Sequence, residues 1–264
     1  EWRRTRVAYE HIEGAIAVLF PHIDTSIDQR YDFFIEQDPD TSLFDDQGAT
    51  GMHAIERILW AGEHPPQVIT FESAIAGYEV ARLPADEAEA RAFRDSLCAR
   101  MVADVEVMQR DFAPLALDPA AAYRGVVGSM AEQREKVRLA ATGEDESRYS
   151  QITLADMRAN LEGGRAIYSH FTGWVRAQPD GAGADASVLA GLDRLDAGYE
   201  AIAGDAMPAV PEGWDPSAPD PAHLQTDYGR LWTLVDSESD PARPSSLVQT
   251  MVQAAALIGI PVLP

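Results

Sequence analysis

The sequence contains only one cysteine and one lysine, and the lack of a second cysteine excludes several kinds of structural and metal site. Cys98 has no second thiol to pair with, which excludes an internal disulfide, a cysteine-based zinc finger and an iron–sulfur cluster. A metal site in this chain must therefore use histidine and carboxylate ligands, which favours iron, zinc, manganese or copper over a metal selected by thiolates. Lys136 is the only lysine, so arginine supplies every other strongly basic side chain.

Basic charge and long apolar runs are also scarce. The 264 residues include 43 acidic and 21 basic side chains, and the formal net charge of -22 argues against nucleic acid or an anionic membrane surface as a partner. No run approaches the roughly 20 apolar residues of a membrane-spanning helix, so we expect no transmembrane segment in this chain. Hydrophobic residues nevertheless make up 46% of the sequence, which indicates a globular protein.

Apolar residues recur at helical spacing along most of the chain, and no convincing strand pattern is found. We therefore predict an all-α protein of two antiparallel helical bundles, residues 1–116 and residues 117–264, joined by the break at 113–119. The first helix is predicted over residues 2–35 with a bend at Pro21, and Thr153 is predicted to cap a helix that ends near Arg176. Further helices are predicted over residues 51–62, 84–112, 119–141, 185–204, 221–237 and 244–258.

The segment Gly51–Trp60 is the clearest candidate for chemistry. His53 and Glu56 are three residues apart and lie on one face of the predicted helix. An imidazole and a carboxylate on one helical face can bind a divalent metal ion. The alternative is an exposed pair that supports the helix and binds nothing, because a His-x-x-Glu pattern is short and common.

Carboxylates of the first predicted helix could complete such a site. Glu10 and Glu13 are again three residues apart, and Asp28 follows further along the chain. Metal sites in helical bundles are built from acids and histidines that face each other across neighbouring helices. The alternative is that these acids form a solvated face, although Glu13 borders the apolar stripe that contains Ile12 and Ile16. The sequence has no His-Glu-x-x-His zinc motif, no Gly-x-Ser-x-Gly and no phosphate-binding glycine-rich loop.

Several segments together resemble the imelysin family, also called peptidase family M75, and most closely its EfeO-like branch of periplasmic iron-uptake proteins. In the family's order, these segments are Tyr9–Glu13, Ile27–Arg30, Gly51–Trp60, Thr142–Glu144, Tyr149–Ser150, Leu154–Asp156 and Ala159–Gly163. The resemblance implies two up-and-down helical bundles with a cleft between them. It also implies an exported protein that is periplasmic or anchored to the outer membrane as a lipoprotein, and we expect that a signal peptide preceded Glu1.

The same resemblance implies a metal site around the Gly-x-His-x-x-Glu motif. The implied ligands are His53, Glu56, Glu10, Glu13, Asp28 and Glu135. The implied cargo is a divalent or ferric metal ion, iron in the first place and zinc in the second. The implied partner is an iron-transport protein of the inner or outer membrane.

From these patterns we expect a cell-envelope metal-binding protein that takes part in bacterial iron acquisition, and binding in preference to catalysis. A metallopeptidase is the first alternative, with Glu10 or Glu13 as general base on a metal-bound water. We place the metallopeptidase behind metal binding because only one histidine lies near the predicted site. Hydrolytic zinc sites usually have two or three histidines. The other alternative is a module that binds haem, polysaccharide or a partner protein and uses the His-x-x-Glu region only for structure.

Overall fold

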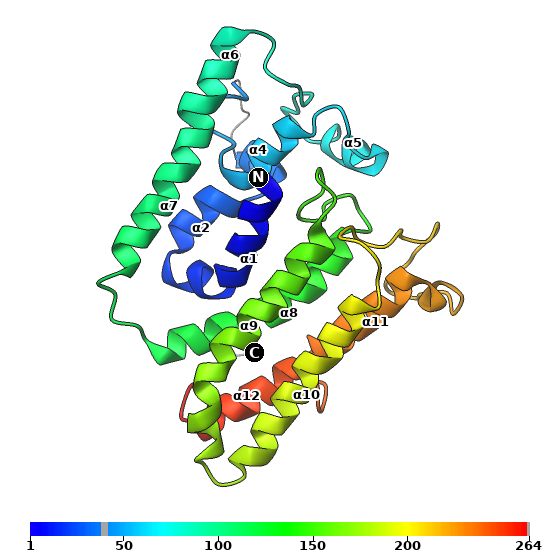
Figure 1. Ribbon diagram of the computed structural model, residues 1–264. Coiled ribbons are helices and arrows are strands. Elements are labelled where there is room, and N and C mark those ends of the chain that lie inside the picture. The colour runs from blue at the N-terminus through cyan, green and yellow to red at the C-terminus, as the bar shows by residue number, and fades with distance from the viewer. Residues whose placement is uncertain (38–41, 263–264) are drawn as a thin grey trace. The chain divides into compact units, whose positions relative to one another are not determined.

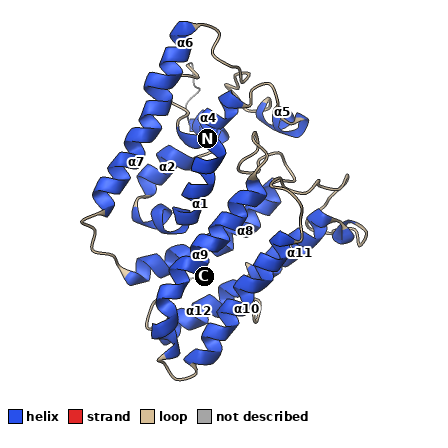
Figure 2. Ribbon diagram, in the orientation of Figure 1, coloured by secondary structure: helices blue, strands red, loops and turns tan. Residues whose placement is uncertain are grey.

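The computed structural model describes residues 1–37 and 42–262, and every regular element in these two ranges is a helix (Figures 1 and 2). The prediction of an all-α protein is confirmed. None of the helices in the described ranges is long and apolar enough to cross a membrane. In chain order the elements are α1 (Trp2–Leu19), α2 (Pro21–Asp28), α3 (Tyr31–Gln37), α4 (Gly51–Leu59), α5 (Pro66–Glu72), α6 (Glu87–Ala92), the π-helical turn η1 (Phe93–Cys98), α7 (Ala99–Phe112), α8 (Pro119–Leu139), α9 (Thr153–Arg176), α10 (Gly181–Glu200), the 3₁₀ turn η2 (His223–Gln225), α11 (Asp227–Glu238) and α12 (Leu247–Leu257).

Two compact units divide the chain, and neither is a continuous segment. Unit 1 consists of Glu1–Arg6, Phe20–Ala116 and Thr142–Gln151. Unit 2 consists of Val7–Leu19, Leu117–Ala141 and Ile152–Pro264. The boundary expected at residue 116 is therefore one of several points at which the chain passes from one unit to the other.

The single bent helix predicted over residues 2–35 is wrong, because the chain forms three helices there. Phe20 separates α1 from α2 with φ −136° and ψ 57°, and Pro21 has no N–H with which to continue the helical hydrogen bonds. Gln29 is extended, with φ −64° and ψ 138°, so α2 ends at Asp28. The carboxylate of Asp28 therefore stands at the end of a short helix and not in the middle of a long one.

Helix α4 begins very close to the end of α2 because residue 51 is a glycine. Gly51 has φ +80°, and a Cβ atom at this position would lie 2.3 Å from the carbonyl oxygen of Ile27. Only a residue without a side chain satisfies both conditions. The close approach brings His53, in the first turn of α4, beside Asp28 at the end of α2.

Unit 2 contains a hydrophobic core to which all five of its long C-terminal helices contribute. Met130, Leu154, Leu192, Val235 and Met251, one from each helix, are fully buried in it. Burying a side chain of this size contributes roughly 1.5–3 kcal/mol. Within this unit α9 packs on both α8 and α10, and α12 packs on α8, α9 and α10.

Two glycines, one on α8 and one on α9, allow the backbones of these helices to contact the backbone of α1. A Cβ atom on Gly125 of α8 would lie 1.9 Å from the carbonyl oxygen of Gly14, and one on Gly163 of α9 would lie 2.1 Å from that of His11. This close packing brings the acidic side chains of α1 within reach of α8 and α9.

The helix that was predicted to end near Arg176 ends there, but its beginning differs from the prediction. Thr153 is its first residue and not its cap, and Ile152 at the cap position makes no side-chain hydrogen bond. The backbone N–H groups of Leu154 and Ala155 instead donate to the carbonyl oxygen of Asp205, at 2.9 and 3.2 Å. A carbonyl from a distant loop thus satisfies donors that a side-chain cap would otherwise satisfy.

Candidate metal centre

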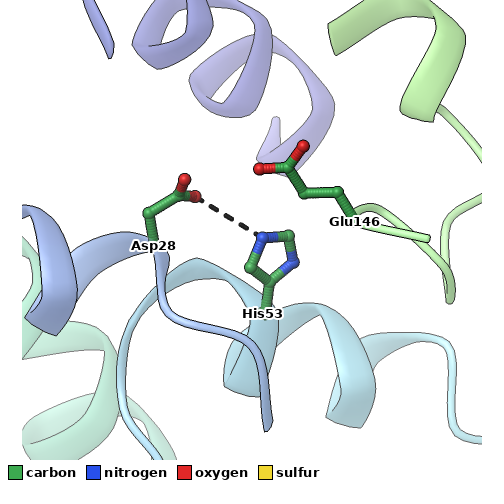
Figure 3. A group of neighbouring side chains, drawn as sticks. All are labelled: Asp28, His53 and Glu146. Carbon is green, nitrogen blue, oxygen red and sulfur yellow. Dashed lines mark ion pairs between the residues drawn. The ribbon is translucent and has the colours of Figure 1, made fainter. Parts of the chain in front are cut away.

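Three side chains of unit 1 converge from segments that are far apart in the sequence (Figure 3). They are Asp28 at the end of α2, His53 in α4 and Glu146 in the Thr142–Gln151 segment, and one ligand atom of each lies within 4.8 Å of the other two. The Nε2 atom of His53 lies 3.5 Å from Oδ1 of Asp28. One imidazole nitrogen with two carboxylate oxygens is a donor set suited to a divalent transition metal.

The two ring nitrogens of His53 have different surroundings. Nδ1 lies 2.9 Å from Oε2 of Glu56, which favours the tautomer in which Nδ1–H donates to this carboxylate. Nε2 is buried and has no hydrogen-bond partner within the described part of the chain. In this tautomer Nε2 presents a lone pair to Asp28 and Glu146. A buried polar atom without a partner costs about 1–3 kcal/mol, and a bound metal ion would remove that cost.

His53 is held in the neutral form that binds metals. Burial lowers its pKa well below the ordinary value of 6.5, and the charge of Arg6 lowers it further. Glu146 acts in the opposite direction, and Arg148 again lowers the pKa. Because the imidazole is neutral near pH 7, it can bind a cation there without first losing a proton.

Glu56 supports His53 and does not face the same space. Its Oε2 meets Nδ1 of His53, and its Oε1 accepts the backbone N–H of Ser150 at 2.7 Å. A carboxylate on the second nitrogen of a metal-binding histidine orients the ring and raises its basicity. The sequence predicts Glu56 as a ligand, whereas in this arrangement both of its oxygens already have partners.

A guanidinium group lies between the two acidic side chains of the site. Arg6 of α1 is 0% exposed, and it forms an ion pair with Oδ1 of Asp28 and another, at 3.0 Å, with Oε1 of Glu146. Trp2, one helical turn earlier, donates from Nε1 to the carbonyl oxygen of Met52 at 3.0 Å. Residues four apart lie on the same helical face, so this contact with α4 also directs Arg6 into the site.

Buried polar contacts fix the Thr142–Gln151 segment, which has no regular structure of its own. Arg148 donates to Oδ1 of Asp32 at 2.6 Å, and the hydroxyl group of Tyr149 donates to Glu72. Glu146 is thus positioned by side-chain contacts of its neighbours. Sequence reasoning missed Glu146, and the available signal was the resemblance of the adjacent Thr142–Glu144 stretch to the imelysin family.

The remaining predicted ligands lie in unit 2. Glu10 and Glu13 are buried on α1, and their carboxylates lie 3.2 and 3.4 Å from Nζ of Lys136. Asn160 donates to Oε2 of Glu13 at 2.7 Å. Glu135 is exposed on α8, and its neighbour Lys136, the only lysine of the chain, is the residue that reaches the two glutamates. As metal ligands, Glu10, Glu13 and Glu135 stay predictions.

Comparison with known proteins gives two results. The sequence profile of the family described as Imelysin matches residues 1–230. The protein named iron uptake system component EfeO of Escherichia coli (strain K12) is 29% identical over 163 residues, which are 62% of this chain and 34% of that protein. The protein of the same name from Shigella flexneri gives the same figures. The matched region spans about a third of the length of these relatives.

Proposed function

The chain belongs to the imelysin family, and from this premise we propose that it is a metal-binding protein that serves iron acquisition. The observation that carries the proposal is the buried Nε2 atom of His53, which has no hydrogen-bond partner in the described ranges and faces two carboxylates. The relatives named as components of an iron uptake system support iron as the metal.

Asp28, His53 and Glu146 are the proposed ligands. A neutral imidazole and two carboxylates suit Fe²⁺, and they also accept Zn²⁺ or Mn²⁺. Iron is proposed here as cargo that the protein captures and hands on. Three protein ligands leave coordination positions for water or for a small ligand that arrives with the iron.

The proposed location is the cell envelope, where the protein would be periplasmic or anchored to the outer membrane as a lipoprotein. The proposed partner is an iron-transport protein of the membrane. Both proposals are supported by the name of the relatives, which are components of an uptake system.

Calorimetric titration with Fe²⁺ under anaerobic conditions, and with Zn²⁺, tests the metal site. We expect one ion to bind per chain, and we expect His53→Ala to abolish binding because it removes the nitrogen ligand. His22→Ala is the matched control, since His22 also lies in unit 1 but is exposed on α2. Equal binding by the wild type and His53→Ala would contradict the proposal.

The metallopeptidase alternative has less support. The site has one histidine, and the two glutamates expected as general bases are both paired with Lys136. Incubation of the metal-loaded protein with an unfolded protein substrate tests it. Metal-dependent cleavage that disappears in His53→Ala would favour the peptidase.

A further inference from the structure

We infer that Arg6 is an internal competitor for the metal ion: its guanidinium group takes the place of a cation between Asp28 and Glu146, and metal binding requires it to leave. This inference rests on the proposed function, because it concerns the same site. It explains how the site can be both acidic and stable before a metal ion arrives.

The competition follows from a shared atom. Oδ1 of Asp28 is the oxygen that pairs with Arg6, and it is also the oxygen that lies 3.5 Å from Nε2 of His53. A metal ion bound by His53 and Asp28 would therefore meet the guanidinium group on one of its own ligand atoms. Arg6 also engages the second carboxylate, since it lies 3.0 Å from Oε1 of Glu146.

Burial makes this competition strong. Arg6 is fully buried, and the side chains of Asp28 and Glu146 are 8% and 13% exposed. Water screens the charges little at such a place, so a guanidinium group beside a metal ion would repel it by much more than at the surface. The guanidinium group of Arg6 and a metal ion therefore cannot both bind the carboxylates of Asp28 and Glu146 without a large cost in free energy.

Arg6 also has a clear role in the metal-free protein. Without it, the carboxylates of Asp28 and Glu146 would face each other beside a neutral imidazole with neither of these two ion pairs, and like charges in a buried site repel. The guanidinium group neutralises this charge until a metal ion replaces it. Because the same group can return when the ion leaves, it weakens metal binding and favours release, which a protein that hands on its cargo requires.

The experiment measures the affinity for Zn²⁺ and for anaerobic Fe²⁺ in Arg6→Gln. We expect the affinity to rise at least tenfold relative to the wild type. We also expect the metal-free variant to melt at a lower temperature than the metal-free wild type. Added Zn²⁺ should raise the melting temperature of the variant by more than that of the wild type, because a ligand that binds only the folded state stabilises it more the more tightly it binds. Arg4→Gln is the matched control: it removes the same charge from the same helix, at an exposed residue, and it should bind as the wild type does.

A second variant and a rescue experiment keep the inference testable if Arg6→Gln folds poorly. Arg6→Lys retains the charge but cannot hold both carboxylates in one planar fork, so a smaller gain in affinity is expected. In Arg6→Ala, millimolar guanidinium chloride should occupy the vacated place and lower the affinity for Zn²⁺, while it leaves wild-type binding unchanged.

The outcomes separate this inference from the proposed function. One outcome is that His53→Ala abolishes Zn²⁺ binding but Arg6→Gln and Arg6→Lys bind Zn²⁺ no more tightly than the wild type does. The inference that Arg6 competes with the metal ion would then be wrong, and the proposed metal site would stand. If Zn²⁺ binding survives His53→Ala in both the wild-type and the Arg6→Gln background, the metal site itself is wrong.

Discussion

Nδ1 of His53 lies 2.9 Å from Oε2 of Glu56 within α4, and both side chains are buried. The other oxygen of this carboxylate accepts the backbone N–H of Ser150 at 2.7 Å. Glu56 therefore orients the imidazole and at the same time fastens the segment that contains Glu146. One side chain links two of the three proposed ligands without contributing a ligand atom itself.

Replacing Glu56 by glutamine should lower the metal affinity and retain the fold. The amide oxygen can still accept a hydrogen bond, but the negative charge that raises the basicity of His53 is lost. Changes at such supporting carboxylates typically cost 10–100-fold in metal affinity, and we expect a loss of about that size for Zn²⁺ by calorimetry. Glu63→Gln, at an exposed position just after α4, is the control. A loss as complete as that of His53→Ala would instead identify Glu56 as a direct ligand.

Alanine at position 51 should disturb both stability and the site. Gly51 has φ +80°, and a Cβ atom there would lie 2.3 Å from the backbone oxygen of Ile27. We expect Gly51→Ala to lower the free energy of unfolding by at least about 2 kcal/mol in urea titrations, and to weaken metal binding by separating His53 from Asp28. Gly62→Ala meets nothing within 4 Å and should change stability little. Similar stabilities for the two variants would refute this account of the α2–α4 junction.

Two glycines of α8 offer a matched test of the helix packing in unit 2. A Cβ atom on Gly125 would lie 1.9 Å from the carbonyl oxygen of Gly14, whereas one on Gly128 meets nothing within 4 Å. Gly125→Ala should therefore destabilise the protein by about 2 kcal/mol or more, because the backbones of α1 and α8 must separate. Gly128→Ala should be neutral or should stabilise by up to about 1 kcal/mol, the helix propensity difference between the two residues. The midpoints of thermal or urea unfolding measure both.

The pair formed by His11 of α1 and Glu162 of α9 should make a small contribution to stability that depends on pH. Partial burial by itself would lower the pKa of His11, but hydrogen bonds with Glu162, at 2.9 Å, and with the carbonyl of Val7 outweigh it and raise the pKa. Because the pKa of His11 is higher in the folded than in the unfolded protein, the protonated histidine stabilises the fold. This stabilisation is complete when the pH is below the pKa of the unfolded state, near 6.5, and it is lost as the pH rises through the pKa of the folded state.

Glu162→Gln tests this dependence. Because the pair is solvent-exposed, we expect the wild type to melt only about 1 °C above the variant near pH 5.5, and we expect no difference near pH 9. Thermal denaturation at the two pH values measures it. A difference of the same size at both would show that the histidine charge is not involved.

The sequence predicted the helical class and much of the helix order, because the apolar period of most of the chain is clear. It also named His53 and Asp28 as candidate ligands from recognisable motifs, and the structure places these two side chains 3.5 Å apart, while their role as ligands stays a prediction. It did not predict that they meet through the short helix α2, because the apolar period continues past Pro21, where the helix breaks, and past Gln29, whose extended backbone ends α2.

Two other residues of the site were beyond sequence reasoning for physical reasons. Glu146 lies in a segment without periodicity, and contacts such as that between Arg148 and Asp32, which are far apart in the chain, set its place. Arg6 is one of three arginines in the first turns of α1, and its burial follows from the face of the helix that Trp2 turns towards α4.

Glu135 and Lys136 show how much the position of a side chain depends on one residue of helical register. Successive residues of a helix are rotated by about 100°, so a shift of one residue exchanges an exposed side chain for a buried one. Here it also exchanges an acid for a base, since Lys136 is the buried neighbour. The apolar stripe of this stretch is interrupted by polar residues on both faces, and it does not fix which of the two points inward.

The discontinuity of unit 1 has a consequence for biosynthesis. Its last segment, Thr142–Gln151, is made only after the whole of α8, which belongs to unit 2. On the ribosome, Asp28 and His53 are therefore synthesised long before Glu146 can join them. The order of the chain alone therefore delays the meeting of the three proposed ligands until the Thr142–Gln151 segment has been made.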